Sequence, residues 1–115
     1  MLLAAYNPRT GQTLCDRARV AQTPDARRVG LLDCLGLPAG EGLCIVPCAA
    51  VHTLGMQFPI DVIFLDRENT VLMVAEMQPG AHAECREAFG VLELPAGTIA
   101  ASGTQSGDRL ELSAY

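Results

Sequence analysis

The chain has 115 residues, half of them hydrophobic and only 4% aromatic, and carries a formal net charge of −5 at pH 7. This length predicts a single domain, residues 1–115, whose core needs no disulfide or structural metal. The acidic balance argues against a nucleic-acid partner, which requires a basic face, and no apolar run approaches the ~18 residues of a membrane span.

The N-terminal segment predicts two strands. Leu2–Tyr6 is a short apolar run that ends at Asn7, and in Thr13–Gln22 apolar residues alternate with arginines, as in a strand with one exposed face. The first residues lack the basic start and the apolar run of about 7–15 residues that a secretory leader needs. We therefore expect a cytoplasmic protein, although a leader removed upstream would leave no trace here.

The principal helix is predicted to begin at Thr23–Asp25. Threonine is a favoured N-cap, proline fits the first helical position, and aspartate suits the positive end of the helix dipole. Apolar residues continue at helical spacing, so we expect the helix to reach Cys34 or Leu35, to end at Gly36, and to pack across a sheet.

The remainder of the chain predicts short strands separated by turns, at 43–46, 49–52, 60–66, 70–76, 91–94 and 109–113. The run 60–66 is apolar on both faces, as in a central strand, and 70–76 returns beside it as a hairpin. One helical turn at 98–102, capped by Gly103, precedes the last strand. This pattern predicts a mainly β fold: a compact antiparallel β-sandwich or barrel-like sheet with one principal α-helix and a short helical turn near the C-terminus.

The polar loop after the strand at 49–52 is the candidate binding site. It carries His52, Thr53 and Met56 between two core strands, where ligand contacts commonly lie. Asp61 follows on the strand face shared with Ile63 and Leu65, so its carboxylate needs hydrogen-bond donors. We expect these donors in the backbone amides of 53–56. Glu93, between two leucines, is either a further member of the site or a solvent-facing strand residue.

The five cysteines predict free thiols, because their number is odd and their neighbours are mostly apolar. Cys44, Cys48 and His52 are each four residues apart, a spacing that would align three metal ligands on a helix. Pro47 and the β-branched residues around it argue against a helix, so we expect no metal site and no cofactor. A nucleophilic Cys48 or Cys85 would need a lowered pKa and a neighbouring base.

The motifs VHTLGMQFPIDVIFLD, VLELPAGT and GDRLEL resemble the family called domain of unknown function 192, and the segments ARRVGLL and EGLCIVPC extend the resemblance from about Arg27 to Leu112. The resemblance implies a compact β-rich domain with one helix and no settled biochemical function. Many relatives have an arginine shortly after Gly30-Leu31, where this chain has Leu32-Asp33-Cys34. The contribution of that arginine in those relatives, such as pairing with a carboxylate, is here made by another residue or missing. Many relatives also have lysine-asparagine-threonine in place of Val51-His52-Thr53.

Three functional interpretations follow from the sequence. The leading one is a non-catalytic domain that binds a small molecule or a protein in a pocket near the 52–56 loop. The alternative is a small hydrolase or metal-dependent enzyme that uses His52 and Asp61. In the third, the polar residues only stabilise the fold. The identity of the partner and the oligomeric state stay open.

Overall fold

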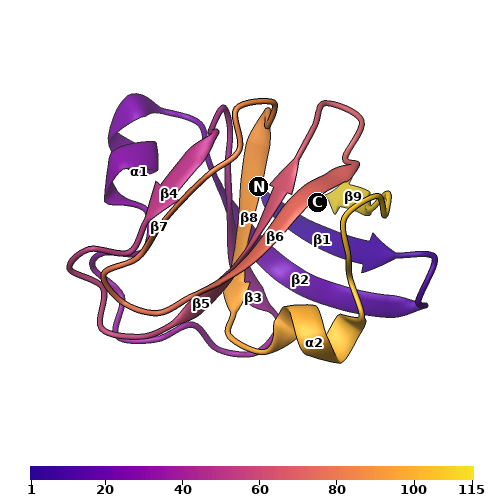
Figure 1. Ribbon diagram of the computed structural model, residues 1–115, viewed down its shortest axis with the longest axis horizontal. Helices are drawn as coiled ribbons and strands as arrows, with labels where there is room; N and C mark the ends of the chain where they lie inside the picture. Colours follow the sequence, from indigo (N-terminus) through magenta and orange to yellow (C-terminus); the bar gives the residue numbers. More distant parts are fainter.

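The computed structural model describes residues 1–115 and confirms a mainly β fold (Figure 1). No helix is long and apolar enough to cross a membrane. The elements are β1 (Leu2–Asn7), β2 (Gln12–Ala21), α1 (Pro24–Val29), β3 (Glu41–Ile45), β4 (Ala50–His52), β5 (Ile60–Leu65), β6 (Val71–Met77), β7 (His82–Glu84), β8 (Gly90–Pro95), α2 (Thr98–Ser102) and β9 (Glu111–Ala114).

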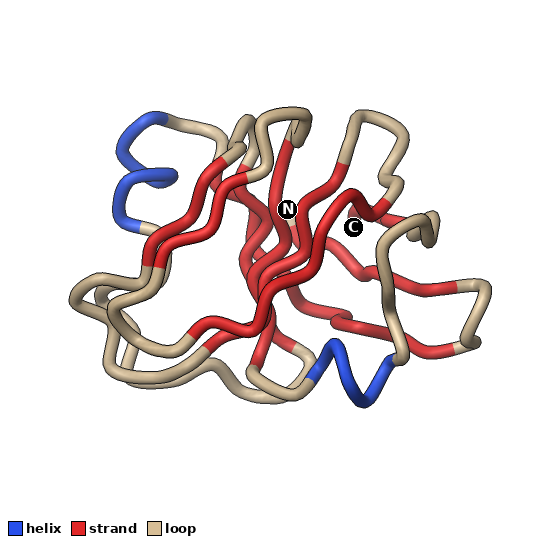
Figure 2. The backbone as a smooth tube through the Cα atoms, in the orientation of Figure 1, coloured by secondary structure: helices blue, strands red, loops and turns tan.

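Seven strands form one strongly curled sheet in the order β6-β5-β8-β3-β2-β1-β9, and β4 pairs with β7 in a separate ribbon (Figure 2). All pairs are antiparallel except β2 with β3. The β5–β6 hairpin confirms the predicted pair. The curl brings the start of β6 to the segment before β9, where Thr70 bridges Arg109 and the Val71 amide donates to the Asp108 carbonyl at 2.7 Å. The sheet is therefore a partly closed barrel.

The two faces of the curled sheet bury separate apolar clusters. Successive residues of a strand point to opposite faces, so Ile63 and Leu65 of β5 enter one cluster with Leu92 and Leu94, while Val62 and Phe64 enter the other. The second cluster is covered by the β4–β7 ribbon and by the segment that follows α1, which lie on the same side of the sheet in Figure 1. All six residues of β5 are buried as a result.

Helix α1 begins where predicted but is shorter than predicted. The Thr23 hydroxyl caps it by accepting a hydrogen bond from the Ala26 amide at 3.1 Å. The helix ends at Gly30, whose φ of +53° leaves helical geometry at little cost because glycine has no Cβ. No residue of α1 itself is buried. The chain is anchored instead by Leu31, directly after the helix, so the predicted extension to Cys34 or Leu35 is wrong.

A buried polar cluster joins the two ends of the chain. The Asp108 carboxylate accepts hydrogen bonds from Arg9 Nε at 2.6 Å, from Asn7 Nδ2 at 2.9 Å and from the Gln105 amide at 3.0 Å. Gly107 and Asp108 form a turn in which the Asp108 side chain accepts from a nearby amide. The partners from β1 and the following turn, about a hundred residues away, could not be predicted from local sequence.

Candidate functional site

A small pocket lies between α1 and the β4 strand, on the face of the curled sheet that the β4–β7 ribbon covers. Its volume is about 80 Å³. It is lined by residues 27–32, Ile45, Cys48, 50–52, Met56 and Glu93. Three of the five candidate residues, His52, Met56 and Glu93, therefore line one pocket. The other two, Thr53 and Asp61, do not line it.

Glu93 is the buried acid of this pocket. It lies on β8, a central strand between β5 and β3, and points to the same face as Val91, so of the two alternatives for Glu93 the solvent-facing position is wrong. Glu93 is only 4% exposed, and burial alone raises the pKa of its carboxyl to about 7. All fully enclosed polar side-chain atoms in the protein have a hydrogen-bond partner. The Glu93 oxygens have none, so they border the pocket.

The Cys48 thiol forms part of the pocket wall next to Glu93. It donates a hydrogen bond to the Ala50 carbonyl at 3.2 Å. Burial raises the pKa of Cys48, and the charge of Glu93 raises it further, while Arg27 and the Ala50 hydrogen bond act in the opposite direction. A raised pKa disfavours the thiolate, so Cys48 lacks the activation that a nucleophile needs.

The other cysteines do not form a ligand set with Cys48. Cys44 is buried in the cluster on the opposite face of the sheet, and burial raises its pKa to about 11, as it does for Cys15. Cys44, Cys48 and His52 therefore do not converge. No three His, Cys, Asp or Glu side chains in the protein are grouped so that they could hold a metal ion.

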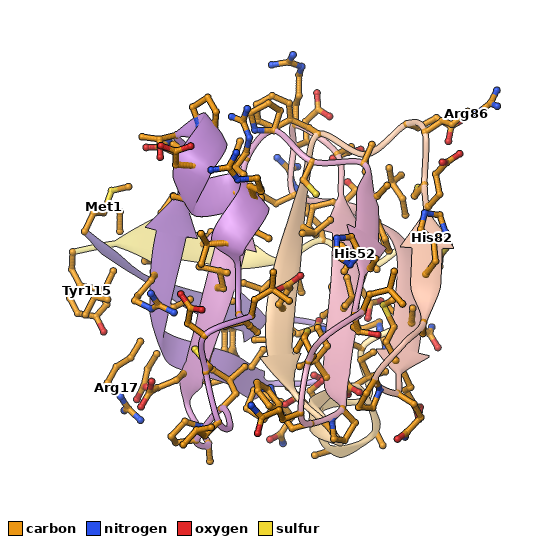
Figure 3. All side chains as sticks on the ribbon, turned by 90° about the vertical axis from the view of Figure 1, so that its left-hand side faces the viewer. Met1, Arg17, His52, His82, Arg86 and Tyr115 are labelled. Atoms are coloured by element: carbon orange, nitrogen blue, oxygen red, sulfur yellow. The ribbon has the colours of Figure 1, made fainter.

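The cationic side chains around the pocket are bound to other groups. Arg27 Nη1 donates to the Gln22 carbonyl at 3.0 Å, and Arg28 Nη2 pairs with Asp25 at 3.0 Å. His52 is exposed on β4 beside His82 of β7, as Figure 3 shows. None of these three cationic or titratable side chains forms an ion pair with Glu93.

Thr53 braces the loop, and burial keeps its hydroxyl away from a ligand. Its side chain is fully buried. Its hydroxyl donates to the Gln78 carbonyl at 2.6 Å and accepts from the Ala81 amide at 2.8 Å. These bonds tie the 53–56 loop to the turn before β7.

Asp61 stabilises the fold at a different place from the one predicted. It lies on the face of Ile63 and Leu65, as predicted, but its carboxylate accepts a 2.8 Å hydrogen bond from the Ile99 amide in α2. The expected bonds from the 53–56 amides are absent, because that loop packs on the opposite face of the sheet. Asp61 and His52 therefore do not form a common site.

Asp61→Ala is expected to lower the free energy of unfolding by about 2 kcal/mol, because the buried Ile99 amide loses its acceptor. Asp61→Asn should cost less, since the side-chain amide oxygen can still accept this single bond. Urea denaturation at neutral pH measures both variants against the parent. A loss below about 0.5 kcal/mol for the alanine variant, typical of a surface change, would contradict this role.

A second, larger depression of about 520 Å³ lies between β2 and α2 and contains none of the candidate residues. Three of its polar side chains are engaged within the protein: Thr98 donates to the Pro95 carbonyl, Ser102 bonds Thr104, and Asp16 pairs with Arg17. Gln12 and Thr13 also line it, but both are exposed. This open groove therefore offers no buried acid without a partner, unlike the smaller pocket at Glu93.

The comparisons with known proteins identify the family and the fold. Residues 6–112 match DUF192, a family described as uncharacterized ACR. No curated protein matches the chain. A putative transcription regulator from Sinorhizobium meliloti 1021 is 25% identical, with a TM-score of 0.81 over 95% of this chain and 90% of that one. A protein of unknown function from Novosphingobium aromaticivorans DSM 12444 shares the fold at 23% identity, with a TM-score of 0.81 over 95% and 82% of the two chains. Since the match spans nearly all its residues, the chain belongs to the DUF192 family.

Proposed function

We propose that this chain is a non-catalytic binding domain whose pocket receives a cationic, hydrogen-bond-donating group of its ligand at Glu93. The observation that carries this proposal is the Glu93 carboxylate, which is 4% exposed, has no partner in the protein and borders the pocket. A ligand that donates to it would supply the missing hydrogen bond.

A carboxylate that is largely buried without a protein donor is costly, because little solvent can reach its charge. The other buried acids of this protein have protein donors: Asp61 has the Ile99 amide, and Asp108 has Arg9 and Asn7. Glu93 is the exception, and such exceptions are concentrated at functional sites. This contrast favours ligand binding over a purely structural role for Glu93.

The site residues favour binding over hydrolysis. The pKa of the Cys48 thiol is raised rather than lowered, and the only histidine that lines the pocket is separated from Asp61 by the sheet. No nucleophile of the pocket is thus activated by its surroundings, and Glu93, whose pKa of about 7 would suit a general base, has no activated nucleophile beside it. A carboxylate that borders a small pocket is sufficient to orient a bound cation.

The experiment is an NMR titration with methylammonium chloride, the smallest organic cation that can place a donor in the pocket. We expect its addition at pH 8 to shift the Met56 methyl resonance and the amides around Glu93, with a dissociation constant on the order of 10 mM, as expected for two heavy atoms. Methanol, which has the same shape without the charge, should bind more weakly. Sodium chloride at equal concentration controls for ionic strength.

The affinity for methylammonium should increase from pH 6 to pH 8, because Glu93 must lose its proton to bind a cation and its pKa is about 7. The Glu93→Gln variant should lose both the binding and this pH dependence. Arg27, Arg28, Cys48 and His52 also face the pocket, so His52→Asn serves to separate any contribution of the imidazole. Equal resonance shifts in the parent and in Glu93→Gln would overturn the proposal.

A further inference from the structure

We infer that the ligand is a segment of another protein that inserts a lysine side chain into the pocket and rests on an apolar rim formed by Val29, Leu32 and Leu54. This inference rests on the proposed function and adds the kind of partner. Its three supports are the size of the pocket, the composition of its mouth and the absence of lysine from the chain.

The pocket is too small to enclose an ordinary metabolite. Its volume of about 80 Å³ is well below the roughly 300–1,000 Å³ of a typical small-molecule site. A primary ammonium is more compact than a planar guanidinium, so it suits this small space better. The main part of any ligand must therefore lie outside, against the mouth of the pocket.

The pocket has an apolar edge beside its cationic lining residues Arg27 and Arg28. Val29 and Leu32 line the pocket and are nevertheless 39% and 37% exposed. Leu54 is 61% exposed and lies between the pocket residues His52 and Met56. The loop adjoins Leu32, because a Cβ on Gly55 would lie 3.7 Å from the Leu32 Cδ2 atom. This apolar rim is suited to hydrophobic side chains of a partner.

A lysine side chain matches both parts of this surface. Its methylene stem packs along apolar residues while its ammonium extends beyond them, here from the apolar rim to the Glu93 carboxylate. The ammonium is complementary to Glu93 itself, because this carboxylate has no cationic partner and the guanidinium groups of Arg27 and Arg28 are held by the Gln22 carbonyl and by Asp25. The 115 residues contain no lysine, so a second copy of them cannot supply this group. The partner is therefore a different protein.

The test compares peptides with the small cation. The probe is an acetylated and amidated pentapeptide, Ala-Leu-Lys-Leu-Ala, titrated at pH 8 and followed by the same NMR resonances. We expect it to bind at least tenfold more tightly than methylammonium. Replacement of its lysine by norleucine, which keeps the stem and removes the charge, should weaken binding at least tenfold.

Variants of the rim separate this inference from the proposed function. Leu54→Ser should weaken peptide binding at least threefold and leave methylammonium binding unchanged, because only the peptide contacts the rim. Tyr6→Ser, at an exposed apolar residue of β1, should change neither. The lysine-segment inference is overturned if methylammonium binds but the peptide binds no more tightly, or if Leu54→Ser does not weaken peptide binding. The site is then one for small amines. If neither probe binds, the proposed function fails as well.

Discussion

Glu93→Gln should raise the free energy of unfolding by about 3 kcal/mol at pH 8 and leave it nearly unchanged at pH 4. Burial raises the pKa of Glu93 from 4.5 to about 7, so the folded protein holds this proton more tightly than the unfolded chain. Stability must then fall as the pH rises from about 4.5, and the loss is complete above about 7. Each unit of pKa shift corresponds to about 1.4 kcal/mol. Glutamine stays neutral at every pH and avoids the loss.

The measurement is urea denaturation of the parent and the variant at pH 4, 6 and 8. Glu76→Gln is the matched control, since Glu76 lies on β6 with an exposed side chain and its replacement should change stability by less than about 0.5 kcal/mol. A difference between Glu93→Gln and the parent that does not vary with pH would show that Glu93 ionises as readily in the folded as in the unfolded protein.

Stabilisation by Glu93→Gln together with loss of methylammonium binding would connect stability to function. Residues that bind ligands are commonly retained at a cost to stability, because the groups that a ligand needs are left unsatisfied in the free protein. Glu93 meets this description in the present structure, where its carboxylate is buried without a donor.

Asp108→Ala should destabilise the protein by about 3 kcal/mol. The substitution removes the acceptor of Arg9, Asn7 and the Gln105 amide, and it leaves the fully buried Asn7 side chain without its Asp108 partner. Loss of one member of a buried pair costs about 3–5 kcal/mol, and the lower end applies because the Arg9 side chain is half exposed. Urea denaturation at pH 7 measures the effect.

Acid should weaken the same cluster in the parent. Hydrogen bonds from Arg9, together with those from Asn7 and Gln105, lower the pKa of Asp108 from 3.8 to about 2. The stability contributed by this shift is present above pH 3.8 and is lost as the pH falls toward about 2. Asp16→Ala, which removes one partner of an exposed pair with Arg17, is the control and should cost less than about 1 kcal/mol. An equal cost for both variants would contradict the role of Asp108.

The local elements of this fold follow from short stretches of the sequence. Alternating and continuous apolar runs located every strand except β7, the runs at 60–66 and 70–76 predicted the β5–β6 hairpin, and Thr23 marked the start of α1. It also identified His52, Met56 and Glu93 as candidate residues that prove to line one pocket. These predictions succeed because turn chemistry, helix capping and strand periodicity depend on neighbouring residues.

The surroundings of each buried acid depend on how distant segments pack together. Strand periodicity predicted that Asp61 shares a face with Ile63, but it could not predict which segment covers that face. Helix α2 covers it, so the Asp61 carboxylate accepts from the Ile99 amide. Glu93 is buried because α1, β4 and β7 converge over its side of β8 from distant parts of the chain. Asn7 and Asp108 meet because the sheet curls. Burial and hydrogen-bond partners depend on which layers pack together, and packing joins residues whose separation along the chain carries no local signal.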